Sequence, residues 1–498
     1  MQIHSNSVHL RWRFFGPVVI GSVCLISLIL LPGVRAELLV GATQTDITPP
    51  LPVALSGQFH TRIATIVESP LIAAAVALEK RDTKGNSIDQ AVMVSCDLVI
   101  IPDDVLEQVR ENLRKRNLEG LRPRKVFLSA THTHTAPVMM EGNYDIPGEG
   151  VTTPAEFVEF LVTKVSDLVE EAWTGREAGE VAWGMGNAVV AQNRRITYLD
   201  GTAKMYGATG NARFKGIEGA ADHGVEVLFI RSGNDKQPSA IAVNVACPAQ
   251  EVGNRSAVNA DYWHEVRQSL AEKFGDDVVI LAWIGAAGDQ SPRLMMRRAA
   301  EQRMLEARGL TRLEEISRRI VAAVDEAWLA AKRDFHPDPP LKHRVLDLEL
   351  PRRLVTPEEL AEAKTEIEKI RTGPGEELHR NLARWAWNQQ TIDRFEKQEG
   401  DPVLPMEMHV LRIGEVAICT NRFELYTEYG LRMKARSRAL QTFVIQLAGQ
   451  GSYLATEEAE NAGGYSAIVN SCEVGPRGGG VLVDEAVNAI NAMWEENP

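Results

Sequence analysis

Two histidines one residue apart, His132 and His134, lie in the stretch "FLSATHTHTAPVMMEGNY" at residues 127–144. The apolar run 125–131 is typical of a buried strand, and residues two apart on a strand point to the same side. Two neutral imidazoles at a strand end are half of a metal site. Either ring could instead only hydrogen-bond within a loop, so the motif needs further ligands nearby.

Two other stretches have residue types suited to catalysis. In "AWIGAAGDQSPRL" (282–294) a strand runs into a glycine-rich turn, where Ser291 could be a nucleophile or a hydrogen-bond donor. In "AQNRRITYLDG" (191–201) the guanidinium of Arg194 could hold a developing oxyanion. We interpret its neighbour Arg195 as an ordinary surface charge.

The C-terminal part of the chain adds a carboxylate and two phenols. Glu424 in "CTNRFELYTEYG" (419–430) lies just beyond an expected strand, at the start of a helix. It could be a ligand, or an ordinary glutamate that the helix dipole favours in the first turn. Tyr453 and Tyr465 lie on glycine-flanked loops in "GQGSYLATEEAENAGGYSA" (449–467). Each of these features alone is a weak signal.

The elements that must position these residues follow an α/β pattern. Helical periodicity is clear, and a capping box at "TPEEL" predicts a helix after Thr356. The expected strands are almost continuously apolar, which suits a sheet covered on both faces. We therefore predict an α/β fold, with a mixed β-sheet core flanked by helices, in a single large domain with a helical insertion at about 295–400. The expected strands are 71–79, 90–97, 125–131, 225–231, 240–247 and 277–285, and the expected helices are 103–118, 154–173, 260–274 and 297–333.

The N-terminus predicts export. Residues 1–36 combine arginines, an apolar stretch and a small-residue cleavage pattern, which is typical of a signal peptide rather than a membrane anchor. The chain of 498 residues has a formal net charge of −13, which becomes −16 when these residues, with three arginines and no acidic residue, are removed. So acidic a chain is not expected to bind nucleic acid. Four cysteines follow the signal peptide, far apart, and no disulfide can be assigned from their spacing.

Taken in order, the motifs resemble a known family, the neutral/alkaline (non-lysosomal) ceramidases, which are zinc amidases that release fatty acid from sphingoid base. The matching stretches are "VGATQTDITPP", "SATHTHTAP", "NRR", "AAGDQSP" and "GSYLAT…GGYS". They extend from residue 40 to about residue 480, so the resemblance covers the catalytic domain, and the family's trailing immunoglobulin-like domain is not expected. The resemblance implies a secreted hydrolase of linear amide bonds that acts in sphingolipid metabolism, with a lipid or other N-acyl substrate and room for peripheral membrane contact.

The resemblance also implies roles for the candidate residues. One Zn²⁺ per chain would be bound by His132, Glu424 and Tyr453, and His134 would lie beside it as a base or substrate contact. Arg194 and Tyr465 would bind the substrate carbonyl or its oxyanion. Ser291 would lie at the scissile amide, and as a covalent nucleophile it would need His134 within hydrogen-bonding reach.

One departure from the family concerns the metal. The family's second zinc histidine is replaced here by Pro248 in "NVACPAQEV" (244–252). Cys247 is a good zinc ligand but points to the other face of the strand, Gln250 is a poor ligand, and His264 lies on an expected helix. Three hypotheses therefore stay open: a zinc-dependent ceramidase, a metal-dependent hydrolase of another amide or ester, and a non-catalytic secreted binding protein that has lost a zinc ligand.

Overall fold

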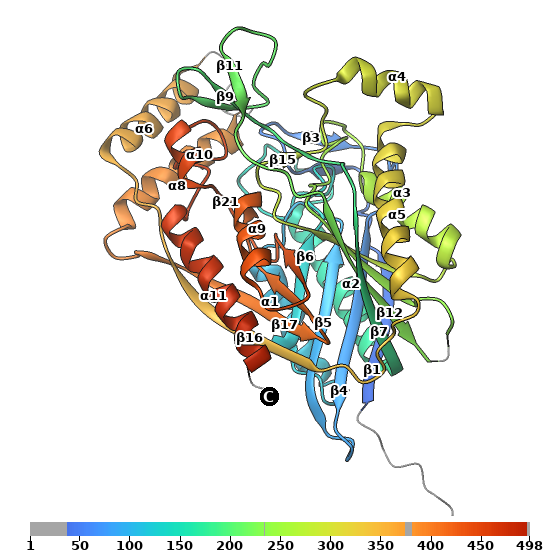
Figure 1. Cartoon of the computed structure of the whole chain (residues 1–498). Helices are drawn as coiled ribbons and strands as arrows, with labels where there is room; N and C mark the ends of the chain where they lie inside the picture. The colour runs from blue at the N-terminus through green and yellow to red at the C-terminus, as the bar shows by residue number, and fades with distance from the viewer. Residues whose placement is uncertain (1–36, 234, 374–380, 496–498) are drawn as a thin grey trace, which may run out of the picture.

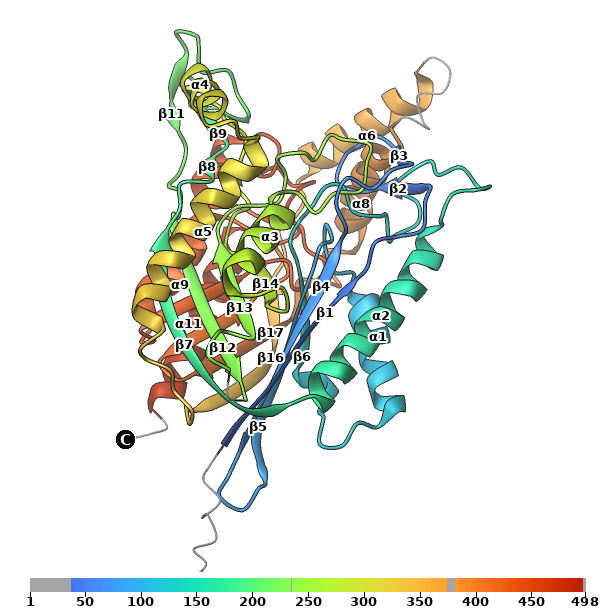
Figure 2. The same cartoon turned by 90° about the vertical axis from the view of Figure 1, so that its right-hand side faces the viewer.

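The computed structural model describes residues 37–233, 235–373 and 381–495, so the expected signal peptide lies outside the described residues. Within these ranges the chain forms two β-sheets packed face to face, with helices on both outer faces (Figures 1 and 2). The mixed α/β core predicted from the sequence is confirmed. No helix in this part of the chain is long and apolar enough to cross a membrane.

The larger sheet contains all six strands predicted from apolar runs. Among the described residues it has eight strands in the order β14-β13-β12-β7-β1-β4-β5-β6. The pairs β5/β6 and β13/β14 are parallel and the other pairs are antiparallel. Its strands are β1 (Glu37–Asp46), β4 (Ile72–Arg81), β5 (Ser87–Cys96), β6 (Val126–Ala130), β7 (Glu177–Asn187), β12 (Gly224–Ser232), β13 (Ala240–Val245) and β14 (Val279–Ile284).

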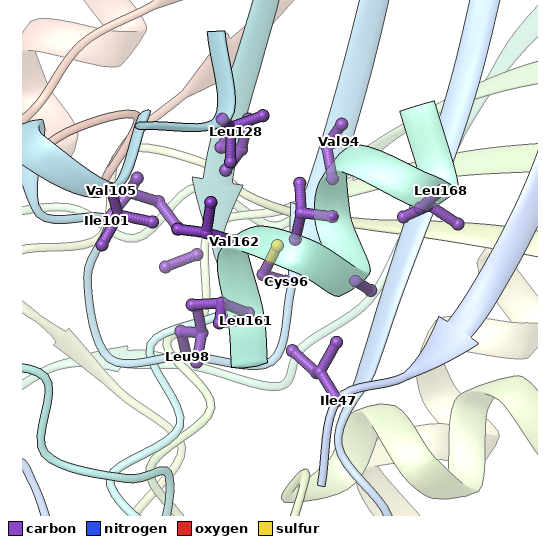
Figure 3. Close-up of a cluster of buried hydrophobic side chains, with 14 of the residues drawn as sticks. Ile47, Val94, Cys96, Leu98, Ile101, Val105, Leu128, Leu161, Val162 and Leu168 are labelled. Carbon is purple, nitrogen blue, oxygen red and sulfur yellow. The ribbon is translucent and has the colours of Figure 1, made fainter. Parts of the chain in front are cut away.

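Helices cover the outer face of this sheet in two groups. Helices α1 (Asp103–Arg116) and α2 (Pro154–Thr174) pack on β4, β5 and β6, and α3 (Tyr262–Phe274) and α5 (Arg312–Ala331) pack on β7, β12, β13 and β14. Figure 3 shows part of the first cluster, where Leu161 and Val162 of α2 meet Val94, Cys96 and Leu128 of the sheet. Burying one such side chain contributes roughly 1.5–3 kcal/mol, which fixes the helices on the sheet.

The single helix expected over 297–333 is two helices. Helix α4 (Arg298–Arg308) ends at Gly309, whose φ of 67° is left-handed, and α5 begins after Thr311. The Thr311 side chain accepts a hydrogen bond from the backbone of Glu314, and the Glu314 carboxylate accepts one in return, which makes a capping box. A glycine stop and a new cap therefore interrupt the periodic pattern.

The second sheet was not predicted from the sequence. Its order is β16-β17-β18-β20, and its inner face packs on the larger sheet through residues such as Leu411 and Phe443. Helices α9 (Thr427–Arg436) and α11 (Pro476–Glu495) cover its outer face. Charged residues alternate with apolar ones along β16, so the run is less apolar than those of the first sheet. The strands are β16 (Leu341–Pro351), β17 (Val403–Ile413), β18 (Val416–Thr420) and β20 (Gln441–Ile445).

The range 295–400, expected as a helical insertion, holds α4, α5, β16 and a pair of helices, α6 (Pro357–Thr372) and α8 (Leu382–Lys397). The predicted capping box is present, with Glu359 N donating to Thr356 Oγ1 at 3.2 Å and Thr356 N donating to Glu359 Oε2 at 2.9 Å. Strand β16 belongs to the second sheet, whereas α4, α6 and α8 of this range stand away from the two sheets (Figure 1). The single-domain organisation stays a prediction.

Short elements gather at one end of the two sheets, where β6, β13, β14 and β18 end (Figure 1). They position the candidate residues described below. They are β2 (Val53–Leu55), β3 (Arg62–Ala64), β8 (Gln192–Asn193), β9 (Arg195–Tyr198), β10 (Ala203–Met205), β11 (Phe214–Ile217), β15 (Gln290–Ser291), β19 (Glu424–Leu425), β21 (Tyr453–Leu454) and α10 (Glu457–Ala462). A 3₁₀ turn (Pro123–Lys125) lies directly before β6, at the opposite end of that strand.

Candidate active site

A cavity of about 330 Å³ opens at the carboxyl ends of the central strands, the edge at which α/β sheets usually form their sites. His132 and His134 reach it from the loop after β6, and Glu424 reaches it from β19, shortly after β18. Tyr453 of β21 and Tyr465 complete this set. The structure therefore brings together five of the seven residues predicted from motifs on the wall of a single cavity.

His132 is held in an unusual backbone conformation that turns its ring to the cavity floor. Its φ is 64°, which is rare for a residue with a side chain. Its Nδ1 lies 2.7 Å from the carbonyl oxygen of Val99, which can only accept, so Nδ1 carries a hydrogen. Its Nε2 then faces Glu424 Oε2 at 3.1 Å. A proton or a cation must lie between these two atoms to make the contact favourable.

Glu424 and Tyr453 are brought together by a short parallel pairing. Strands β19 and β21 place the two residues directly opposite each other, although they are far apart in the sequence. Burial raises the pKa of the Glu424 carboxyl, but His132 and Arg194 outweigh this and leave the pKa below its ordinary value. Burial also holds the pKa of Tyr453 well above its ordinary value. The pair therefore presents a carboxylate and a neutral phenol.

Arg194 lies directly behind this pair. Its guanidinium donates to Tyr453 Oη at 3.1 Å and to the Gly288 carbonyl at 2.8 Å, and one nitrogen is 3.7 Å from Glu424 Oε2. Despite burial, Tyr453, Tyr206 and Glu424 raise the pKa of Arg194 well above its ordinary value, so it stays charged. It is a fixed positive charge beside the cavity floor.

Arg195, expected to be a surface charge, is buried. Its guanidinium pairs with the Glu218 carboxylate and donates to the carbonyls of Ala459, Gly463 and Tyr465. Strand alternation turns it away from Arg194 and toward the segment that carries Tyr465. Arg195 therefore holds the tyrosine loop in place, a role that its sequence context does not reveal.

His134 meets His132 edge to face, with the two Nε2 atoms 3.4 Å apart. The rings converge because of the loop and not because of strand alternation, since β6 already ends at Ala130. Gly57 and Gly253 pack against the His134 side chain, where a Cβ atom would approach to 2.4 and 2.9 Å. Burial, followed by the charges of His132 and Arg194, lowers the pKa of His134 well below its ordinary value, so the ring is neutral.

Gln250, dismissed from sequence as a poor ligand, is the functional neighbour that sequence reasoning missed. Its Nε2 lies 2.8 Å from His134 Nε2, and its Oε1 accepts from Arg194 Nη1 at 3.1 Å. By contrast, the buried Cys247 thiol contacts the carbonyls of Val190 and Pro248, and His264 lines a different cavity. The described cysteines are all free.

Ser291 lies outside the cavity lining and is fully buried. Its Oγ accepts from Tyr206 Oη at 3.0 Å and from the backbone N of Arg293 at 3.1 Å. The Tyr206 hydroxyl in turn accepts from Arg194 at 3.3 Å. Within the described ranges no hydrogen bond joins Ser291 to His134, so this geometry makes Ser291 a support for Tyr206 and Arg194.

An aromatic and apolar wall faces the polar floor. The rings of Phe59, Trp387 and Tyr465 lie 5.8–5.9 Å apart from centroid to centroid, and Tyr453 and Tyr465 are 5.7 Å apart. Met139 and Met140 also line the cavity. Other parts of the lining are polar, with the side chains of Gln58, Asn143, Gln390 and Asn470 among them.

The residues on the floor fit a metal ion in part. Among residues 37–495 as described, no group of three or more His, Cys, Asp or Glu side chains is arranged to hold a metal. Tyr453 adds a third donor to His132 and Glu424. The 3.1 Å between His132 Nε2 and Glu424 Oε2 is close to the roughly 3.3 Å that separates two ligand atoms of a tetrahedral ion with bonds of about 2.0 Å. His134 Nε2 is already engaged by Gln250. His132 and Glu424, with the Tyr453 phenol beside them, therefore fit a cation in part.

The arrangement of these layers is a known class of fold, that of the neutral ceramidases. The structure of the neutral ceramidase from Pseudomonas aeruginosa is similar to this chain with a TM-score of 0.67 and 18% identity, covering 93% of this chain and 75% of that one. A structure described as ceramidase complexed with C2 has the same TM-score at 16% identity, covering 93% and 76%. No protein-family model and no curated protein matches the chain. The resemblance seen in the sequence motifs is confirmed at the level of the fold.

Proposed function

We propose that the chain is an exported, metal-dependent amidase of the ceramidase type, which hydrolyses the N-acyl amide bond of a lipid. The observation that carries this proposal is the convergence of His132, Glu424 and Tyr453 on the floor of one cavity, with Arg194 behind them. Export through residues 1–36 and peripheral contact with a membrane are parts of the proposal.

The metal would be bound by His132 Nε2, Glu424 Oε2 and Tyr453 Oη. When bound there, Zn²⁺ supplies a Lewis acid that polarises a carbonyl and lowers the pKa of a water molecule. The hydrogen bond from His132 Nδ1 to Val99 supports this assignment, because it orients the ring and leaves Nε2 free to bind.

Three side chains of the protein would stabilise the developing negative charge or accept a proton. Tyr465 lines the cavity, and burial raises its pKa to about 12, so at neutral pH it keeps its proton and can donate to an oxyanion. The positive charge of Arg194 stabilises the same oxyanion from behind the floor. One such donor is typically worth about 3 kcal/mol of transition-state stabilisation. His134 Nε2 is the group placed to accept the proton released by the attacking nucleophile, once the Gln250 N–H that occupies its lone pair has turned aside.

The cavity walls support an N-acyl lipid substrate. Met139, Met140, Phe59 and Trp387 offer apolar and aromatic surface for an alkyl chain. With ceramide, cleavage of the amide would give a sphingoid base and a fatty acid, which is a step of sphingolipid metabolism.

A second candidate is a hydrolase of a more polar amide or ester. The observation that favours it is the polar part of the lining, with Gln390 and Asn470 among the residues around the cavity. Amide side chains there would bind hydroxyl or amide groups of a substrate with a larger polar portion.

The test combines metal analysis with turnover. We expect the purified protein to contain about one zinc per chain and to hydrolyse a fluorescent ceramide. Dialysis against a chelator should abolish both, and added zinc should restore them. In His132→Ala we expect the metal and the activity to be lost with the fold retained, because the ring lies at a sheet edge outside the main hydrophobic clusters.

His264→Ala is the matched control, because this histidine lines a separate cavity and should not affect either measurement. Zinc with turnover of polar N-acyl or ester substrates, but not of ceramide, would select the second candidate. Metal retained in His132→Ala would contradict the ligand assignment. Absence of both metal and turnover would favour a non-catalytic binding protein.

A further inference from the structure

Gln250 is buried between two residues of the proposed site, Arg194 and His134. Its side chain lies in the loop after β13 and is buried, with a residue exposure of 7%. Its two polar ends contact Arg194 and His134. A buried amide with a charged donor on one side and an imidazole on the other has its orientation determined by those neighbours.

The orientation of the amide follows from Arg194. A guanidinium has only donors, so the Gln250 atom at 3.1 Å from Arg194 Nη1 must be the oxygen. Arg194 itself cannot turn easily, because Gly288, Tyr453 and Tyr206 also receive hydrogen bonds from it. The amide nitrogen of Gln250 is therefore the atom that faces His134, and it can only donate.

We infer that Gln250 is a positioning residue that holds His134 in the tautomer with the hydrogen on Nδ1 and the lone pair on Nε2. The 2.8 Å contact between Gln250 Nε2 and His134 Nε2 is a hydrogen bond only in that tautomer. In that tautomer the lone pair of His134 Nε2 accepts from Gln250, and no N–H group of the ring faces His132 Nε2, which lies 3.4 Å away.

This inference deepens the proposed function, on which its catalytic meaning rests. A base must show its lone pair to the proton that it removes. A chain of hydrogen bonds from Arg194 through Gln250 to His134 would keep the lone pair on Nε2 before a substrate arrives, and Gln250 would release it when the proton is transferred. The positive charge of Arg194 would thus act on His134 through an amide as well as across space.

The test is the tautomer of His134, read from ring ¹⁵N resonances of the full chain labelled at histidine. The His134→Gln variant assigns the signals by their disappearance. In the wild type we expect Nδ1 to carry the hydrogen and Nε2 to have the shift of an unprotonated nitrogen. In Gln250→Glu, which keeps an oxygen for Arg194 but has no donor for His134, we expect the hydrogen to move to Nε2.

Gln58→Glu is the matched control, because it adds the same charge on the lining of the same cavity while Gln58 bonds to the Gly253 carbonyl and not to His134. It should leave the His134 signals unchanged. A wild-type ring with hydrogen on Nε2, or an unchanged tautomer in folded Gln250→Glu, would overturn the inference. If Gln250→Glu does not fold, the wild-type spectrum alone decides. Turnover is not needed, so failure of the proposed function would be seen separately in the ceramide assay.

Discussion

The molecule contains two buried histidine pairs that share one pattern and differ in one respect. In the core between the two sheets, His343 Nε2 contacts His409 Nδ1 at 2.8 Å, and His409 Nε2 contacts Glu407 Oε1 at 2.9 Å. In the cavity, His132 contacts both His134 and Glu424. Each pair thus joins two imidazoles to one glutamate.

In each pair one ring also faces a backbone carbonyl. His343 Nδ1 lies 3.0 Å from the carbonyl of Gln90, as His132 Nδ1 lies 2.7 Å from that of Val99. In the core pair, three contacts each need one hydrogen: carbonyl to ring, ring to ring, and ring to glutamate. Two neutral imidazoles carry only two hydrogens, so one contact lacks a hydrogen when the glutamate is ionised. Both pairs therefore have a place for one additional positive charge.

The difference lies in what can supply that charge. The core pair is packed against Phe127 and lies beside Arg110 and Lys125, and only a proton can enter it. The cavity pair lies at an open wall with a tyrosine as an added donor, and there a metal ion can enter. An imidazole–carboxylate chain therefore becomes a candidate metal site where a metal ion can reach it and a third ligand lies beside it.

The largest expected effect comes from exchanging the two glutamates for glutamine, one at a time. Glu424→Gln removes the charge that would hold a metal, and we expect zinc affinity and kcat/KM to fall about 100-fold or more. Glu407→Gln removes one of the two carboxylates paired with Arg110 and leaves it the more exposed Glu107, so we expect about 2 kcal/mol lower free energy of unfolding with normal activity.

Chelator competition, ceramide turnover and urea denaturation measure these effects on the same two proteins. The two variants are controls for each other, since each changes one glutamate of a histidine pair. Loss of activity in Glu407→Gln, at a temperature where it is folded, would break the division between a structural and a functional pair.

A second test concerns the packing that holds His134 against its partner. Gly57 has a φ of 93°, and a Cβ atom there would lie 2.4 Å from the His134 ring. We expect Gly57→Ala to displace the ring and lower kcat/KM by roughly 10- to 100-fold, as a misplacement of about 1 Å can do.

Gly85→Ala separates backbone strain from contact with the ring. Gly85 has a similar φ of 84° but nothing within 4 Å of the added atom. It should lose roughly 1 kcal/mol of stability and keep full activity. Equal activity in the two alanine variants would show that close packing does not position His134.

The sequence predicted the cavity pair better than the core pair for a physical reason. His132 and His134 are separated by one residue in the chain and lie in one motif, so their closeness in space follows from the local sequence. His343 and His409 are joined by the antiparallel pairing of β16 with β17, two strands that were not predicted. Long-range pairing of half-apolar strands leaves little trace in local periodicity.

The same distinction applies inside the site. Glu424 and Tyr453 were found through motif resemblance, and their direct pairing in β19/β21 is visible only in three dimensions. The sequence indicates only that the residue type of Gln250 is a poor metal ligand. Its contacts with Arg194 and His134 depend on three separate segments, which no local pattern contains.

The smallest expected effect is on the pH dependence of stability, and it sharpens the assignment of the core pair as structural. Burial, followed by His409 and Lys125, lowers the pKa of His343 well below its ordinary value, and burial also lowers that of His409, against the opposing effect of Glu407. The folded state therefore keeps neutral rings that the unfolded state protonates as the pH falls through about 6.5.

Stability should thus be fully present above that pH and decline below it, with each ring contributing at most about 1.4 kcal/mol per pH unit. In His343→Gln we expect a shallower decline between pH 6.5 and 5 in urea denaturation. The carboxyl of Glu407, whose pKa is lowered to about 2, titrates outside this window and should not mask the change. An unchanged slope would mean that His343 is already protonated in the folded protein, so that the core pair, like the cavity pair, holds its additional positive charge at neutral pH.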